Sequence, residues 1–167
     1  MLNMKKVTLI LFLILCQLFG GCFYTNQENM LNNDFKPVYM TRIQLENSVV
    51  LENPKTNIQS GKIYIKDDLM FVNDINKGFQ VYNYSDPSNP VAINYINFPG
   101  ATDMAIRNNI LYVNQAVDLV SVNYNIINNT ILITNRIENT FPQKTSPQGF
   151  EGNGTENKII INWIANN

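Results

Sequence analysis

Few residues in this chain could carry out chemistry, and the missing residue types exclude several classes of enzyme. The 167-residue sequence has no histidine, which excludes Ser-His-Asp catalysis, Cys-His catalysis and histidine-ligated metal sites. Carboxylates alone could hydrolyse a glycosidic bond if two of them faced that bond. Asp67 and Asp68 form an adjacent acidic pair, but their setting between two short apolar runs is typical of a hairpin turn. We therefore predict no catalytic residue, no cofactor and no bound metal.

Two further aspartates raise a calcium hypothesis, because Asp86 and Asp103 offer hard oxygen ligands. Calcium prefers about six to eight oxygens, and the sequence has no dense Asp-x-Asp-x-Asp spacing. Asp86 stands directly before Pro87, where an aspartate commonly starts a turn by accepting a hydrogen bond from its own backbone. The turn is the favoured prediction. Aromatic residues could form a stacking platform for a sugar or peptide, but at alternating strand positions they are predicted to pack in the core: Tyr64, Tyr82, Tyr84, Tyr95, Tyr112, Tyr124 and Trp163.

Cys22 is the side chain that we expect to be chemically modified. A basic pair, Lys5-Lys6, precedes the apolar run Val7–Leu15, and Gly20-Gly21 stands directly before the cysteine. A basic start, an apolar run and small residues at the cut are typical of a secretory signal peptide. The order resembles the lipobox of bacterial lipoproteins, in which the cysteine is acylated and becomes the new N-terminus. Phe19 departs from the leucine that this family prefers three places before the cysteine.

The lipobox resemblance implies a membrane anchor made of fatty acyl chains such as palmitate, and a place in the bacterial cell envelope. We expect the outer membrane, with the protein facing the periplasm or the cell surface. A spanning helix is the alternative, but it needs about 20 apolar residues, and Gln17 and Gly20 interrupt the run here. Cys16 lies inside the predicted signal, so no disulfide is expected after cleavage.

Removal of residues 1–21 leaves 10 basic and 13 acidic residues, a net charge of −3. No basic stripe is present, so we predict no nucleic-acid partner. Residues 22–59 are rich in asparagine and show no clear period, which predicts a flexible tether. A short apolar alternation around Val38–Leu45 could dock on the domain as an irregular strand.

From residue 60 the pattern changes to short runs of β-branched and aromatic residues separated by Asp, Asn, Gly and Pro. This pattern predicts an all-β fold of antiparallel strands, with no helix beyond the signal. Ile63–Asn73 aligns with Met104–Asn114, and Phe79–Tyr84 aligns with Leu119–Tyr124. Four strands that recur after about 40–45 residues are typical of a propeller blade. We predict two four-stranded repeats, at 60–100 and 101–141.

Seven segments of these repeats resemble the LVIVD-repeat proteins, bacterial β-propeller proteins that are often exported or lipid-anchored. The segments are Gly61–Asn73, Lys77-Gly78, Ser85–Pro90, Ile96–Gly100, Asp103–Ile106, Leu111–Val113 and Asp118–Val120. The resemblance implies an envelope location and a binding surface built from repeats. It supplies no catalytic residue.

Family members usually carry more repeats, whereas residues 142–167 read as a polar linker followed by one strand, Lys158–Trp163, which could continue the repeat. Because a closed propeller needs roughly four to eight blades, two would leave apolar faces uncovered. A truncated relative, self-association through these faces, and a small sandwich of two sheets are the alternatives. Truncation is favoured, with the two sheets stacked on each other.

Two classes of function follow. The first is a non-enzymatic binding or scaffold protein that meets an envelope protein or polysaccharide. The second is a carboxylate-dependent hydrolase of envelope glycans, which requires two convergent carboxyl groups. A remnant without activity is the remaining alternative.

Overall fold

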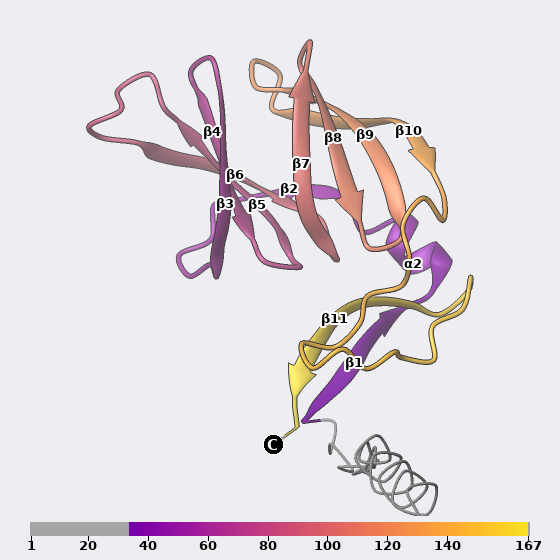
Figure 1. Ribbon diagram of the computed structural model, residues 1–167. Coiled ribbons are helices and arrows are strands. Elements are labelled where there is room, and N and C mark those ends of the chain that lie inside the picture. The colour runs from indigo at the N-terminus through magenta and orange to yellow at the C-terminus, as the bar shows by residue number, and fades with distance from the viewer. Residues whose placement is uncertain (1–33, 167) are drawn as a thin grey trace, which may run out of the picture. The chain divides into compact units, whose positions relative to one another are not determined.

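The computed structural model describes residues 34–166, which contain eleven strands and one short helix. The predicted signal peptide, Cys22 and the first part of the predicted tether lie outside these residues. The strands are β1 (Phe35–Met40), β2 (Val50–Glu52), β3 (Ser60–Lys66), β4 (Leu69–Asp74), β5 (Gly78–Asn83), β6 (Val91–Asn97), β7 (Ala101–Arg107), β8 (Ile110–Gln115), β9 (Asp118–Asn125), β10 (Thr130–Ile137) and β11 (Ile159–Ala165), and the helix is α2 (Arg42–Glu46). They form three antiparallel sheets, with the orders β2-β6-β5-β4-β3, β10-β9-β8-β7 and β1-β11 (Figure 1). The predicted all-β fold is confirmed.

Each predicted repeat forms four consecutive strands of one sheet. β3–β6 lie within residues 60–100, and β7–β10 lie within residues 101–141. Within each repeat, successive strands of the chain are hydrogen-bonded neighbours in the sheet. The first sheet also has a fifth strand, β2, which pairs with β6 and was not predicted.

Equivalent turns join the first two strands of each repeat. Lys66 pairs with Leu69 across Asp67-Asp68, and Arg107 pairs with Ile110 across Asn108-Asn109. Asp67 has a φ of 52°, and Asn108 and Asn109 have φ values of 48° and 62°. Asp and Asn tolerate this left-handed conformation, which matches the twist of a two-residue hairpin. The prediction that Asp67 and Asp68 form a hairpin turn is confirmed.

The prediction of a flexible tether is wrong for residues 35–52, where the structure has β1, α2 and β2. β1 has its hydrogen-bond partner in β11, at the other end of the described chain, with a register shift between Val38 and Tyr39. A capping box starts α2, since Thr41 and Gln44 each bond the other's backbone N–H, and Leu45 is fully buried. The irregular strand expected around Val38–Leu45 is met in part by β1, but α2 takes the place of its second half, so the expectation of no helix beyond the signal is wrong. β2 was not predicted, because its partner β6 is distant in sequence.

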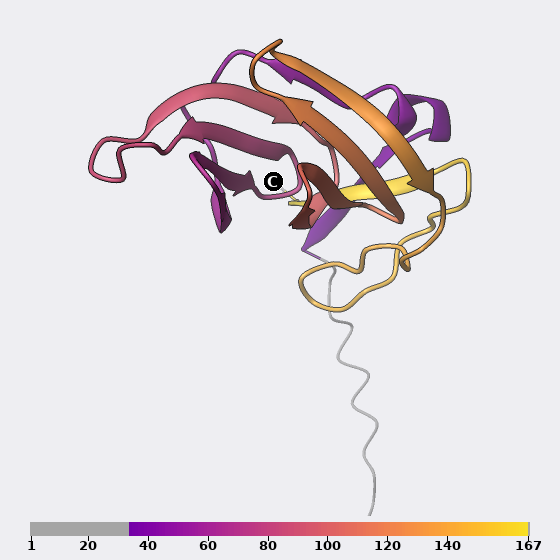
Figure 2. The same ribbon diagram turned by 90° about the horizontal axis from the view of Figure 1, so that it is seen from above.

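The C-terminal strand does not continue the repeat. β11 pairs with β1 in a separate two-stranded sheet, and both views show these two strands side by side (Figures 1 and 2). A second apolar cluster joins it to the rest of the unit: Leu45, Ala116, Val117 and Ile159. The predicted polar linker is held down by side chains, for example where Gln143 Oε1 accepts from the Ile160 backbone N–H at 2.9 Å.

The main core lies between the two larger sheets. The first sheet contributes Phe71, Phe79, Val81 and Ile96, and the second contributes Met104, Leu111, Val113, Val120, Val122 and Tyr124. When the two repeats are aligned, the sheet face that is buried in one repeat is the face that is exposed in the other. Phe71 is 2% exposed whereas its equivalent Tyr112 is 36% exposed, and Ile63 is 60% exposed whereas its equivalent Met104 is 5% exposed.

Successive side chains of a strand point to opposite faces of the sheet. The first sheet therefore packs one face against the opposite face of the second sheet, so that the two repeats stack front to back. Neighbouring propeller blades stack in this way. A sandwich with two-fold symmetry would instead bury equivalent residues of both repeats.

Candidate functional site

A concave site of about 540 Å³, here called the inter-sheet cleft, opens between the two larger sheets at the end where the β3–β4 and β7–β8 turns stand. Its apolar lining consists of Leu69, Phe71, Ile106, Leu111, Tyr124 and Ile126. Its polar lining consists of Lys66, Asp67, Asp68, Asn83, Ser85 and Asn109. Both repeats therefore line one cleft, and the turns that connect their strands supply most of its polar groups.

Aromatic contacts across the sheets form the inner part of the cleft. The rings of Phe71 and Tyr124 meet edge to face, with 6.2 Å between centroids. The Tyr124 hydroxyl donates to Asn94 Oδ1 at 2.7 Å, and burial raises the pKa of this phenol. A hydrogen-bonded, neutral Tyr124 holds the two sheets at a fixed separation and leaves an apolar ring edge toward the cleft.

The polar lining is partly engaged within the protein. Lys66 forms an ion pair with Asp67, and Asn83 Oδ1 accepts from the Ser85 hydroxyl at 2.7 Å. The side chains of these exposed turn residues stand beside an apolar surface. A surface of this kind binds a ligand with an apolar body and peripheral hydroxyl, amide or charged groups.

The carboxylates of the cleft come from one turn. Asp67 and Asp68 are consecutive residues of the first repeat, and the second-repeat wall offers Asn109, their equivalent, in place of a carboxylate. Glycoside hydrolysis needs two carboxyl groups that flank the scissile bond. The lining therefore favours binding over hydrolysis at this place.

The two aspartates of the calcium hypothesis have other partners. Asp86 Oδ1 accepts from the Ser88 backbone N–H at 2.9 Å, the predicted turn geometry. Asp103 forms an ion pair with Lys62 and accepts from the Tyr64 hydroxyl at 2.6 Å. These bonds hold the pKa of Asp103 below its ordinary value, while burial and Asp103 raise the pKa of Tyr64 to about 12. Within residues 34–166, no group of three or more acidic, histidine or cysteine side chains is placed to hold a metal ion.

The aromatic residues predicted to pack in the core are divided between several places: Tyr95 and Tyr124 are buried, whereas the prediction is wrong for Tyr112, which is 36% exposed. Tyr95 is fully buried, donates its hydroxyl to Asp74 Oδ2 at 3.0 Å and carries the Lys55 ammonium 3.6 Å from its ring centre. Burial raises its pKa well above the usual value. Trp163 lies on β11 and donates to the Lys144 carbonyl at 3.0 Å. Tyr95 and Trp163 thus bond within the fold and do not line the inter-sheet cleft.

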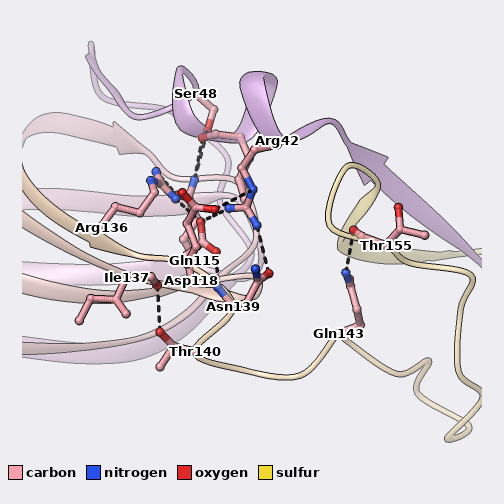
Figure 3. A network of polar contacts seen from close by, with 12 residues as sticks. Arg42, Ser48, Gln115, Asp118, Arg136, Ile137, Asn139, Thr140, Gln143 and Thr155 are labelled. Atoms are coloured by element: carbon pink, nitrogen blue, oxygen red, sulfur yellow. Dashed lines mark hydrogen bonds and ion pairs between the residues drawn. The ribbon is translucent and has the colours of Figure 1, made fainter.

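Sequence reasoning missed a buried charge network around Asp118 (Figure 3). Asp118 Oδ2 lies 2.5 Å from Arg42 Nη1 and 2.6 Å from Arg136 Nη1, and the Asp118 side chain is fully buried. Asp118 Oδ1 accepts from the Asn139 backbone N–H at 3.1 Å, and Arg136 Nη2 donates to Gln115 Oε1 at 2.8 Å. The network ties α2 to β9 and β10 of the second repeat, so it acts as a structural clamp.

A second cavity, about 740 Å³, lies between the β4–β5 turn and the C-terminal segment. Lys144 lines it and donates from Nζ to Asn76 Oδ1 at 3.0 Å, while Asn76 Nδ2 donates to Asn162 Oδ1 at 2.9 Å. Burial lowers the pKa of Lys144 to about 8. Asn76 thus joins the first repeat to the C-terminal loop and to β11.

Cys22, the predicted lipid attachment site, lies outside the described residues. Among residues 34–166, no helix is long and apolar enough to cross a membrane. No family model, no curated protein and no solved structure matches this chain.

Proposed function

We propose that this protein is lipid-anchored in the bacterial cell envelope and has a non-enzymatic binding role. The observation that carries the binding role is the inter-sheet cleft, which combines an apolar lining with exposed turn residues and has carboxylates from one side alone. A carbohydrate or a peptide segment of an envelope component fits this chemistry, because both combine apolar surfaces with hydroxyl or amide groups.

The resemblance to the lipobox and to the LVIVD repeats supports the envelope location. Lys5-Lys6, Val7–Leu15 and Gly20-Gly21-Cys22 stand in the order that a lipoprotein signal requires. Several acyl chains on one residue anchor a protein stably, whereas one chain binds only marginally.

The anchor is tested by metabolic labelling with a fatty acid, followed by membrane fractionation. We expect wild-type protein to carry label and to sediment with membranes, and Cys22→Ala to lose the label completely. Cys16→Ala is the matched control and keeps the label, since position 16 lies within the cleaved segment. Label retained by Cys22→Ala would refute the lipid assignment.

The cleft is tested by two neighbouring isoleucines of the β9–β10 loop. Ile126 lines the cleft, whereas Ile127 is 91% exposed and does not. Against soluble peptidoglycan fragments and envelope polysaccharides, we expect Ile126→Asp to weaken binding by about tenfold, because a charge placed in an apolar contact must be desolvated. Ile127→Asp leaves binding unchanged. Binding is measured by calorimetry, with the same mixtures assayed for cleavage; equal losses in both variants, or turnover of any fragment, would contradict the proposal.

A further inference from the structure

In the part of the chain that the structure describes, two sheet faces are open, and each is equivalent to a face that is buried in the other repeat. On the outer face of the first sheet, Ile63 is 60% and Ile65 is 55% exposed. Their equivalents, Met104 and Ile106, pack in the core between the sheets. Residues 53–59 cover the other end of this outer face, where the Lys55 backbone N–H bonds Gln80 and the Gln59 backbone N–H bonds Asp74. The end beside the β3–β4 turn stays open.

The outer face of the second sheet is the complementary one. Tyr112 is 36% exposed there and Ile137 is 52% exposed. Tyr112 is equivalent to the buried Phe71, which packs against the second sheet inside the chain. One chain therefore has two exposed surfaces that correspond to the two sides of its own interface between the sheets.

We propose that a second copy of this chain occupies these faces. The outer face of the first sheet in one copy stacks on the outer face of the second sheet in the other copy. This contact between copies repeats the front-to-back interface that the two sheets form within one chain. This inference rests on the repeat geometry and is independent of the proposed ligand cleft.

The internal interface predicts which side chains meet between copies. Inside the chain, Tyr124 contacts the ring of Phe71 and donates its hydroxyl to Asn94 Oδ1. The alignment of the repeats places Tyr84 at the position of Tyr124 and Tyr112 at the position of Phe71.

The equivalent of Asn94 follows from the strand pairing. Asn94 pairs with Val81, and Asn135 pairs with Ser121, which is the repeat equivalent of Val81. Asn135 therefore takes the place of Asn94. Tyr84 of one copy would meet an aromatic ring, Tyr112, and an amide oxygen, Asn135, of the other copy. The contact between copies would therefore keep the three chemical groups of the internal contact: a tyrosine hydroxyl, an aromatic ring and an amide oxygen.

Such a contact joins different surfaces of the two copies and is heterologous, so it either closes a ring or extends a filament. Since closed propellers have roughly four to eight blades, a ring would hold about two to four copies of this two-blade unit. A closed ring would cover both open faces of every copy.

The test uses two full-length versions of the chain with different tags, expressed together. One carries Tyr84→Cys and the other carries Tyr112→Cys, so a link between positions 84 and 112 can form only between copies. After treatment with a short bismaleimide reagent, we expect linked peptides that join these positions. In the control pair, Ile127→Cys replaces Tyr84→Cys, and we expect no link to position 112.

A third variant tests the apolar contact while leaving the core untouched. Ile65→Lys, at a position that is 55% exposed, is expected to lower the yield of the 84–112 link by about tenfold, because a lysine would be buried against the second copy. An absent 84–112 link overturns the proposal. So does an equally strong link in the Ile127 control, a yield unchanged by Ile65→Lys, or a dominant link between two copies of the same position, which indicates a two-fold contact.

Discussion

Asp118→Ala is expected to lower the free energy of unfolding by about 3–5 kcal/mol, because it removes the buried carboxylate that Arg42 and Arg136 share and leaves Arg42 with the exposed Glu138, 3.8 Å away, as a weak substitute. The carboxylate of Asp118 is fully buried, and the side chains of Arg42 and Arg136 are 13% and 12% exposed. Neither guanidinium can be fully rehydrated at this burial. Removing one partner of a buried ion pair costs more than the pair contributes, since the remaining charge keeps its desolvation penalty.

The measurement is urea unfolding of a chain that begins at residue 22 and carries Cys22→Ala, so that no lipid is present. Asp67→Asn is the control, because it removes the charge of an exposed ion pair with Lys66 and keeps a residue that tolerates the left-handed backbone at this position. Exposed pairs contribute about 0–1 kcal/mol, and we expect a change in that range. If Asp118→Ala changed the unfolding free energy as little as Asp67→Asn, the network could not be the clamp between α2 and the second repeat.

The strands of the repeats could be predicted from sequence because their signals are local. Each hairpin places its two strands next to each other along the chain, and the turns at Asp67-Asp68 and Asn108-Asn109 carry residues that favour left-handed backbone. Duplication added a second, independent copy of the same pattern. These two facts fixed the all-β class and the positions of eight strands, β3–β10.

The buried face of each repeat could not be predicted, because both faces are apolar. Ile63, Tyr64 and Ile65 are consecutive, and only the second of them packs on the core between the sheets. Alternation assigns side chains to two faces and does not say which face meets the neighbouring sheet. The partners of β1 and β2 could not be predicted either, because β11 and β6 are distant in sequence.

The charge network was missed for a related reason. Its members are far apart in the sequence (Arg42, Asp118 and Arg136), and an isolated aspartate at the start of a strand gives no signal of burial. The first repeat has Gly78 at the position of Asp118, where a Cβ would lie 2.1 Å from the Ile96 carbonyl oxygen. This difference between the repeats is visible in the alignment, and it could have marked position 118 as specific to the second repeat.

The second large effect is expected at Phe71, where alanine should lower the free energy of unfolding by about 3–5 kcal/mol. Phe71 is 2% exposed in the core between the sheets and meets Tyr124 edge to face. Truncation would leave a cavity between the sheets and remove the aromatic pair. Tyr112, at the same place in the second repeat, lies on the open face, and Tyr112→Ala should cost about 1 kcal/mol or less in the monomer.

Urea unfolding of Phe71→Ala and Tyr112→Ala decides between front-to-back stacking and a two-fold sandwich. The protein concentration must be low enough to keep the chain monomeric. Front-to-back stacking predicts unequal losses, with the cost at position 71 at least about 2 kcal/mol larger than the cost at position 112. Equal losses at the two positions would mean that both repeats bury the same face, and would contradict the stacking on which the cleft and the self-association depend.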